Sequence, residues 1–245
     1  MKTKQLSFLL ALTFLFLFSG SATANQSKTI TFSVKGQDLN MILIPKGETV
    51  IGHKEANIGN YQPFPTKINE DFYIGETEVT QSLYEVVMGN NPSNPIGGNL
   101  PVNKVSLDDA IKFIEKVSSL LDKKFRLPTS SEWEYACQSG GASKFYWGDK
   151  FLTKYIRHPE SRGKLEIVKS NSPNDYGLFG MADNVSEWSD PEGKIKKGSI
   201  YYKVKGGNYN SFMKMDFMCA HFLQRYSFNK TPIIGFRLAL DITNH

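Results

Sequence analysis

The sequence lacks any long run of charge of one sign. Its 29 lysine and arginine residues are dispersed among 24 aspartate and glutamate residues, and the formal net charge is +5 at pH 7. Domains that bind nucleic acid usually carry their cations on a stripe or along one helix face. The dispersed charges therefore argue against a nucleic-acid partner and favour a mixed, solvated surface.

Cysteine is scarce, since the whole chain contains only Cys137 and Cys219. Two cysteines allow a single pairing. In an oxidising compartment an even pair is a candidate disulfide, whereas in the cytosol the same two residues would more often be thiols. The compartment therefore decides how the pair is interpreted.

Long, mostly apolar stretches are absent except near the start of the chain, where residues 6–18 follow Lys2 and Lys4. This run is too short to span a membrane, and it leads to Ala22-Thr23-Ala24, an A-x-A cleavage pattern. Residues 1–24 are therefore predicted to be a signal peptide that is cut after Ala24. We expect an exported chain, periplasmic or secreted, and no stable membrane anchor after cleavage, because no cysteine near the cut can carry a lipid.

The 221 residues that remain suit a single domain with one core. Residues 25–40 are predicted to form a polar lead-in strand, in which apolar residues alternate from Ile30 to Val34, and residues 41–45 to form a second strand. Residues 50–72 are rich in Gly, Pro and Asn and are predicted to be a loop. The following segment, 72–80, alternates like a strand that leads into a helix.

Capping residues mark three helix starts, at Thr80, Ser106 and Thr129. Ser106 with Asp109 and Thr129 with Glu132 have the spacing of a capping box. Apolar residues follow at helical spacing, but beyond residue 140 no helix is predicted. We expect an α+β, loop-rich domain with two main helices and short antiparallel strands.

Several segments, in order along the chain, resemble the formylglycine-generating enzyme (sulfatase-modifying factor) family. They are 41–47 (MILIPKG), 72–80 (FYIGETEVT), 101–106 (PVNKVS), 126–136 (RLPTSSEWEYA), 176–179 (YGLF), 204–207 (VKGG) and 235–239 (GFRLA). Each is weak alone, whereas their order is specific. The resemblance implies the family's fold, a single domain related to C-type lectins, over residues 41–242.

The chain departs from that family at its catalytic residues. Active members oxidise a substrate cysteine to formylglycine with copper and oxygen, using two cysteines just after the Gly-Gly motif. Paired thiolates suit Cu(I) because it prefers soft ligands. After Gly206-Gly207 this chain has only Cys219, at the far end of the segment. The resemblance therefore implies that no catalytic residue of the family is retained and that copper is not expected, which argues against an oxidase and leaves the question of an enzyme open.

The resemblance also gives the two cysteines a structural role. Cys219 lies sixteen residues before Gly235, where some family members have a structural cysteine. The partner of that cysteine directly follows the Glu-Trp-Glu-Tyr-Ala motif, which is the position of Cys137 here. A Cys137–Cys219 disulfide is thus implied. The alternative, Cys219 as a lone redox or copper-binding thiol, would leave Cys137 unpaired in an oxidising compartment.

Other metals have less support in the sequence. Iron-dependent relatives place three histidines around the metal, whereas the four histidines here are dispersed without an H-x-x-x-H pattern. A set of soft residues that can attract copper follows the glycine pair: Met213, Met215, Met218 and His221. Because phenylalanines are interleaved with them, strand packing or an apolar binding patch is the preferred interpretation.

Calcium is the remaining cofactor that the resemblance implies as possible. One family site uses oxygens around the Gly-Asn-x-x-Glu-Trp segment, and the matching ligands here are Asp183, Val185 and Glu187. Gly180 stands where the family usually has Asp or Asn, so one side-chain ligand is lost. Calcium accepts six to eight oxygens in a flexible geometry, which allows Asp183 to compensate.

The segment 208–232 is the candidate binding surface, because aromatic residues are enriched in interfaces. Its candidate residues are Tyr209, Ser211, Phe212, Lys214, Asp216, Phe222 and Tyr226. The leading hypothesis is a non-catalytic binding or accessory protein whose ligand is a protein, peptide or glycan. The alternatives are a metal-dependent oxidase or maturation factor and a variable ligand-binding receptor of a diversity-generating system, since such receptors share this fold.

Overall fold

The computed structural model describes residues 28–56, 62–155, 163–196 and 199–242. The signal peptide and the cleavage site predicted from the sequence lie outside these residues. None of the helices formed by the described residues has the length and apolar character needed to cross a membrane.

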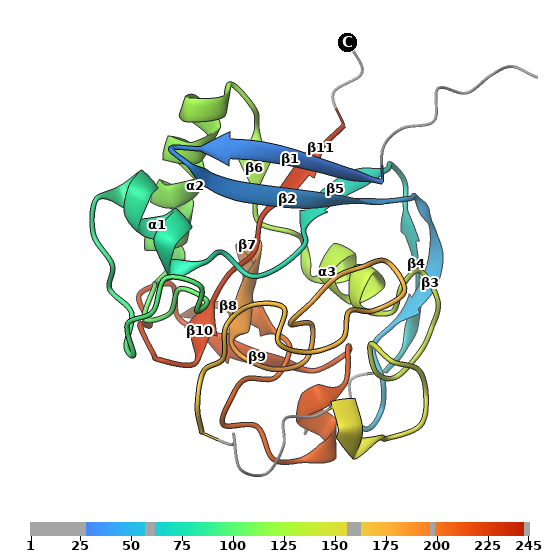
Figure 1. The fold of residues 1–245 in the computed structure, drawn as a ribbon. Coiled ribbons are helices and arrows are strands. Elements are labelled where there is room, and N and C mark those ends of the chain that lie inside the picture. Colours follow the sequence, from blue (N-terminus) through green and yellow to red (C-terminus); the bar gives the residue numbers. More distant parts are fainter. Residues whose placement is uncertain (1–27, 57–61, 156–162, 197–198, 243–245) are drawn as a thin grey trace, which may run out of the picture.

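One sheet of five strands joins the two ends of the domain (Figure 1). Its strands, in spatial order, are β1 (Thr29–Val34), β2 (Gln37–Ile44), β5 (Phe72–Gly75), β11 (Ala239–Asp241) and β6 (Phe125–Arg126). All neighbours are antiparallel. The alternating residues Ile30 to Val34 of the predicted lead-in lie in β1, whereas residues 37–40, which were assigned to the same lead-in strand, belong to β2.

Three α-helices begin at the predicted caps: α1 (Gln81–Met88), α2 (Leu107–Leu121) and α3 (Ser130–Cys137). The Thr80 side chain accepts a hydrogen bond from the Leu83 amide, and complete capping boxes start α2 and α3. The expectation of two main helices was therefore too low. With eight residues, α3 is as long as α1.

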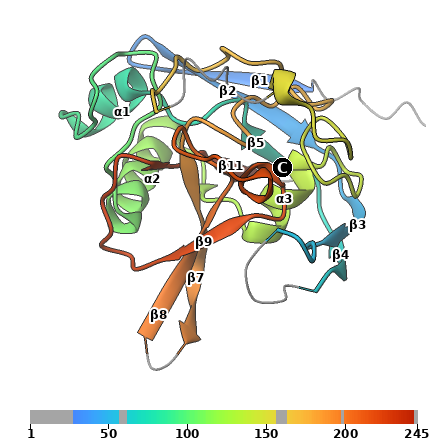
Figure 2. The same ribbon diagram turned by 90° about the horizontal axis from the view of Figure 1, so that it is seen from below.

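A second sheet carries the C-terminal half, with strands in the order β10 (Ile234–Gly235), β7 (Ser186–Lys196), β8 (Ser199–Lys205) and β9 (Phe222–Arg225). The β7–β8 hairpin extends away from the body of the domain (Figure 2). Two short 3₁₀ helices, η1 (Thr153–Tyr155) and η3 (Lys214–Phe217), lie in the loops.

The loop predicted for residues 50–72 is wrong in part, because β3 (Gly47–Ile51) and β4 (Phe64–Ile68) pair as an antiparallel hairpin. Pro65 lies opposite Val50 in this two-stranded sheet. Proline is tolerated there because both strands are edges, where a missing N–H need not break a ladder. Composition alone therefore concealed the hairpin.

Buried tryptophans connect the loops to two apolar clusters. Trp188 lies in the cluster under α1 and α2, and Trp133 lies in the cluster around α3. Each indole N–H has a partner: Trp188 donates to the Val105 carbonyl at 3.0 Å, and Trp133 donates to Glu187 at 2.6 Å. Both residues thus combine core packing with a polar anchor, as buried tryptophan usually does.

Candidate functional site

Cys137 and Cys219 form a buried disulfide, with Cα atoms 5.7 Å apart. It links the end of α3 to the residues after η3 across a sequence separation of 82. In the chain-entropy model a closed loop of this length stabilises the fold by about 4–5 kcal/mol. Because the chain has no other cysteine, no thiol remains to bind Cu(I).

The loop that follows the glycine pair is held by internal polar contacts. A Cβ on Gly207 would lie 2.8 Å from the Asp216 carbonyl oxygen, so only glycine fits beside η3. One Asp216 carboxylate oxygen accepts the amide N–H groups of Phe212 and Met213, each at 3.0 Å. Asp216 is buried, so its predicted place on a binding surface was wrong, because these two amides draw the carboxylate inward.

A buried ion pair fixes the base of this loop. Lys205 Nζ lies 2.9 Å from Glu134 Oε2, and both side chains are 1 % exposed. The other Glu134 oxygen accepts the Gly52 amide at 2.6 Å. His221 lies nearby with Nδ1 3.0 Å from the Ala56 carbonyl, and burial lowers its pKa. These contacts couple the loop to the turn after β3, and sequence reasoning had missed them.

The three methionines of the loop line one pocket, and His221 does not line it. Met213, Met215 and Met218 line a pocket of about 280 Å³ together with Glu55 and Lys214. Of the two interpretations of the methionines, strand packing was wrong, since this stretch forms η3. The other, an apolar binding patch, stays a prediction.

An arginine and a carboxylate form the centre of the domain. Arg237 and Glu187 are both fully buried, and two parallel N–H groups of the guanidinium donate to the two carboxylate oxygens at 2.7 Å each. The Trp133 indole is a third donor to Glu187. The guanidinium also donates to the carbonyls of Gly75 and Phe179. This bidentate geometry is the strong form of an ion pair, and it joins four segments of the chain.

Glu78 lies beside this pair but has no partner. Its side chain is buried, and neither carboxylate oxygen has a hydrogen bond. Burial raises the pKa of Glu78 to about 8, Glu187 and Asp183 add to the increase, and Arg237 opposes it. A Cβ on Gly180 would lie 2.5 Å from both oxygens of Glu78. The missing side chain at position 180 thus leaves room for this carboxylate.

The acidic residues of this centre differ in their contacts. Glu187 is committed to Arg237 and Trp133, whereas neither carboxylate oxygen of Glu78 has a hydrogen bond, and the charge of the buried Asp183 contributes to the raised pKa of Glu78. Val185 is buried immediately before β7 and can contribute only its carbonyl. In the part of the chain that is described, no group of three His, Cys, Asp or Glu side chains is placed to hold a metal. Main-chain oxygens or water would have to complete a calcium site here.

The predicted surface residues fall into two regions. Around η3, the exposed residues Phe212 and Lys214 and the half-buried Tyr209 and Ser211 lie beyond the glycine pair. With neighbours from residues 144–154 they form what we call the loop patch, defined by Lys144, Lys150, Phe151, Leu152, Lys154, Phe212, Met213 and Lys214.

The second region is a stack of three rings, one from β8 and two from the residues that follow β9. The rings of Tyr201 and Tyr226 are 4.6 Å apart with their hydroxyls at 2.8 Å, and Phe228 stacks on Tyr226 at 5.3 Å. We call Tyr201, Tyr226 and Phe228 the aromatic stack. Phe222, in contrast, is half-buried on β9 beneath the Lys203 ammonium.

The sequence model of the sulfatase-modifying factor enzyme 1-like domain matches residues 27–242. The chain belongs to this family. The sequence resemblance is thereby confirmed, and so is the α+β fold class. Among solved structures, Treponema denticola variable protein 1 superposes with a TM-score of 0.75 and 25% identity over 87% of this chain and 99% of that chain.

Named relatives within the family differ in what they are said to do. The chain is 31% identical to chaperone protein LppX of Paenibacillus barcinonensis, covering 48% of this chain and 61% of that protein. It is 28% identical to the mouse formylglycine-generating enzyme over 58% of this chain and 45% of that enzyme. It is 29% identical to the bovine inactive C-alpha-formylglycine-generating enzyme 2 over 60% of this chain and 57% of that protein. The chain thus spans about half the length of these relatives.

Proposed function

We propose that this chain is an exported, non-catalytic member of the sulfatase-modifying factor family that binds a partner. The disulfide between Cys137 and Cys219 carries the proposal, because it uses every sulfhydryl of a chain whose scaffold is otherwise kept. Copper in this family needs two thiolates, which oxygen or amine side chains do not replace as soft ligands. The bovine relative named as inactive and the relative named as a chaperone are compatible with such a role.

The aromatic stack is the surface that we assign to the partner, a protein, peptide or glycan. Phe228 is 67 % exposed, although it packs flat against Tyr226. The loop beneath it is rigid, because Asn229 accepts the Tyr226 amide, Ser227 accepts the first amide of α2, and Lys230 pairs with Asp109 at 2.8 Å. Preformed aromatic surfaces bind well because little entropy is lost on association.

Calcium bound at Glu78 and Asp183 is the cofactor that we propose for the buried centre. A divalent ion would give Glu78 a directly bound positive charge, whereas the Arg237 guanidinium directs its carboxylate hydrogen bonds to Glu187. It would act structurally, by holding the residues around Gly180 against the strand that ends at Gly75. The test is thermal unfolding of the mature protein in EDTA and in calcium. We expect a higher melting temperature in calcium for the native sequence and no change for Glu78→Gln.

Two measurements test the main proposal. First, the purified mature protein is incubated with copper, oxygen and a cysteine-containing sulfatase peptide, beside an active family member. We expect no formylglycine, and product formation would favour the alternative of a metal-dependent oxidase. Second, co-purification from the native host should retain a partner that Phe228→Ser loses and that Phe212→Ser, at an equally exposed ring, keeps. Loss by both variants or by neither would contradict the assignment of the stack.

A variable ligand-binding receptor is the second candidate. The likeness to Treponema denticola variable protein 1, over nearly the whole of that chain, favours it. A near-copy of the DNA that encodes residues 208–232, lying beside the gene, would support this alternative. A single copy would argue against it.

A further inference from the structure

The loop patch places exposed apolar side chains from two distant segments side by side. Phe151 is 36 % and Leu152 38 % exposed, while Phe212 is 66 % and Met213 41 % exposed. Phe151 meets Phe217 of η3 with ring centroids 6.3 Å apart, and η1 and η3 are neighbours in Figure 1. Large apolar side chains that cluster on a surface usually mark an interaction site.

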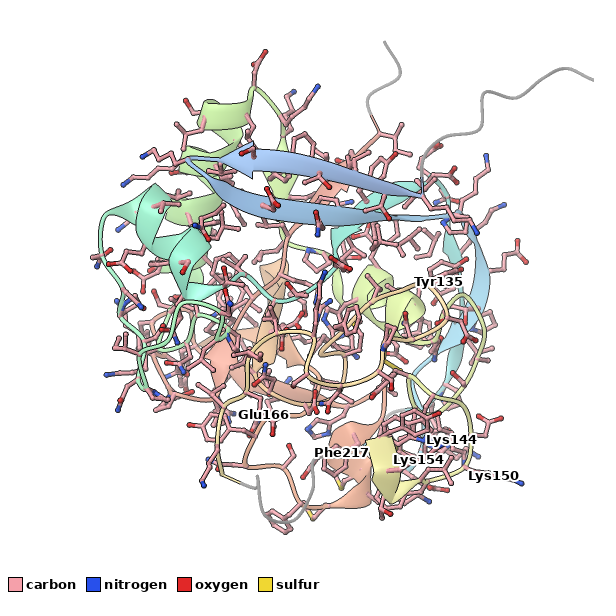
Figure 3. All side chains as sticks on the ribbon, in the orientation of Figure 1. Tyr135, Lys144, Lys150, Lys154, Glu166 and Phe217 are labelled. Carbon is pink, nitrogen blue, oxygen red and sulfur yellow. A yellow bond between two sulfur atoms is a disulfide. The ribbon has the colours of Figure 1, made fainter. Side chains whose placement is uncertain are left out.

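Lysines surround these apolar side chains. Figure 3 shows Lys144, Lys150 and Lys154 gathered at the end of the molecule opposite the β1–β2 hairpin, with Phe217 beside them. Lys214 joins them, because it and Lys144 both reach Glu55, at 3.8 and 3.7 Å. Within the described residues, Glu55 is shared by these two ion pairs, and the exposed Asp149, whose carboxylate accepts the Lys144 amide, is a second acidic group beside the four lysines. The lysines therefore outnumber the acidic groups.

The exposed apolar side chains of the loop patch are supported by well-packed residues beneath them. The ring of Trp147 is stacked between Phe145 at 4.9 Å and Tyr155 at 5.2 Å, and its indole donates to the Lys150 carbonyl. The Cys219 amide donates to the Lys144 carbonyl, which ties both segments to the disulfide. The apolar tips are therefore held in place, and their exposure does not come from a loosely attached loop.

We propose that the loop patch docks on an anionic phospholipid surface. The apolar side chains project from loops. The pocket beside them, lined by Glu55, Met213, Lys214, Met215 and Met218, holds only about 280 Å³, too little for a helix of a partner. Projecting apolar tips flanked by lysines suit a fluid interface, where the tips enter the acyl boundary and the ammonium groups meet phosphates. Such binding is reversible, and it goes beyond the proposed function without resting on it.

Vesicle sedimentation of the mature protein tests this docking. We expect binding to phosphatidylcholine vesicles that contain phosphatidylglycerol, weaker binding at high salt, and little binding to phosphatidylcholine alone. Lys150→Glu with Lys154→Glu should weaken binding by at least about 25-fold, taking about fivefold for each lysine. Phe212→Ser should weaken it by about tenfold. The matched control Phe228→Ser, at a ring of the same exposure in the aromatic stack, should bind as the unmodified protein does.

Fluorescence gives a second readout that a general loss of folding cannot imitate. Trp147 is the half-exposed tryptophan of the patch, whereas Trp133 and Trp188 are fully buried. Brominated lipids should quench the emission of the bound protein, and Trp147→Phe should remove most of the quenching. Equal binding to neutral vesicles, or an equal loss with Phe228→Ser, would overturn the proposal. The proposal would also be overturned if the protein did not bind the anionic vesicles and its loop patch bound an acidic polypeptide instead.

Discussion

Glu187 and Glu78 are two buried carboxylates of one acidic centre, and they differ in every polar contact. Glu187 accepts two hydrogen bonds from Arg237 and one from Trp133. Glu78 accepts none, and burial raises its pKa to about 8. The same arginine influences both groups, but its guanidinium is oriented toward only one of them.

This difference distinguishes Glu187, whose hydrogen bonds are all made within the fold, from Glu78, whose oxygens have no hydrogen-bond partner. A buried ion pair with all its hydrogen bonds made is weak evidence of function, because it fixes the packing of its own segments. A buried carboxylate without partners is unusual in native proteins and calls for a proton, an ion or water. Glu187 is therefore a framework residue, and Glu78 is the residue for which we propose a ligand.

Breaking the paired carboxylate should have the largest effect. Arg237→Met leaves Glu187 buried without its cation, and we expect the free energy of unfolding to fall by about 3–5 kcal/mol. Urea denaturation measures the loss. Arg237→Met combined with Glu187→Leu should recover part of the stability, because no uncompensated charge is then buried. If Arg237→Met lowered the free energy of unfolding by less than about 1 kcal/mol, Glu187 would not depend on its ion pair as this comparison with Glu78 requires.

The unpaired carboxylate should instead appear in the pH dependence of stability. The folded pKa of Glu78, about 8, lies above its ordinary value of 4.5, so the folded state binds the proton more tightly. The resulting stability is complete below about pH 4.5 and is lost as the pH rises through 8, on the order of 5 kcal/mol in EDTA.

Glu78→Gln is the control for this pH profile. It should remove the decline between pH 4.5 and 8 while leaving the contribution of His221, whose lowered pKa acts in the opposite direction. Unfolding free energies of both proteins across this range make the comparison. Parallel profiles would show that Glu78 has an ordinary pKa in the folded state.

Calcium should give an effect of similar or smaller size. An ion that binds only the folded protein adds about 3 kcal/mol at a concentration about one hundred times its dissociation constant. Asp183→Asn should weaken the binding, whereas a change at Glu187 should act mainly through the ion pair. Isothermal titration of the refolded Asp183→Asn variant checks this. Unchanged calcium affinity would exclude Asp183 as a ligand.

Changes at the two exposed surfaces should hardly affect stability. Phe212→Ser and Phe228→Ser remove rings that are mostly solvated already, and we expect shifts within about 0.5 kcal/mol. Chemical denaturation of both variants provides the measurement. A loss above about 2 kcal/mol for either one would show that its ring belongs to the core.

Local signals made the helix starts predictable. A capping box involves residues three apart, so Ser106 with Asp109 and Thr129 with Glu132 could be found in the sequence. The resemblance likewise implied the disulfide that the structure contains. The β3–β4 hairpin was missed because Pro and Gly composition outweighed its alternation.

Features that depend on tertiary contacts could not be predicted in this way. Glu78 lies in a segment that reads as an ordinary strand, and only the packing of Gly180 and Arg237 around it reveals an unpartnered carboxylate. Asp216 was expected at the surface because it is charged, but two amides of its own loop hold it inside. The sequence indicates neither arrangement.

The central claim is that the family scaffold here has no thiol to bind copper, and counting thiols tests it most directly. The purified protein is denatured and treated with an alkylating reagent before and after reduction, and its mass is measured. We predict no modification before reduction and two afterwards, one for each cysteine. Two modifications without reduction, together with one bound copper per chain, would contradict the account.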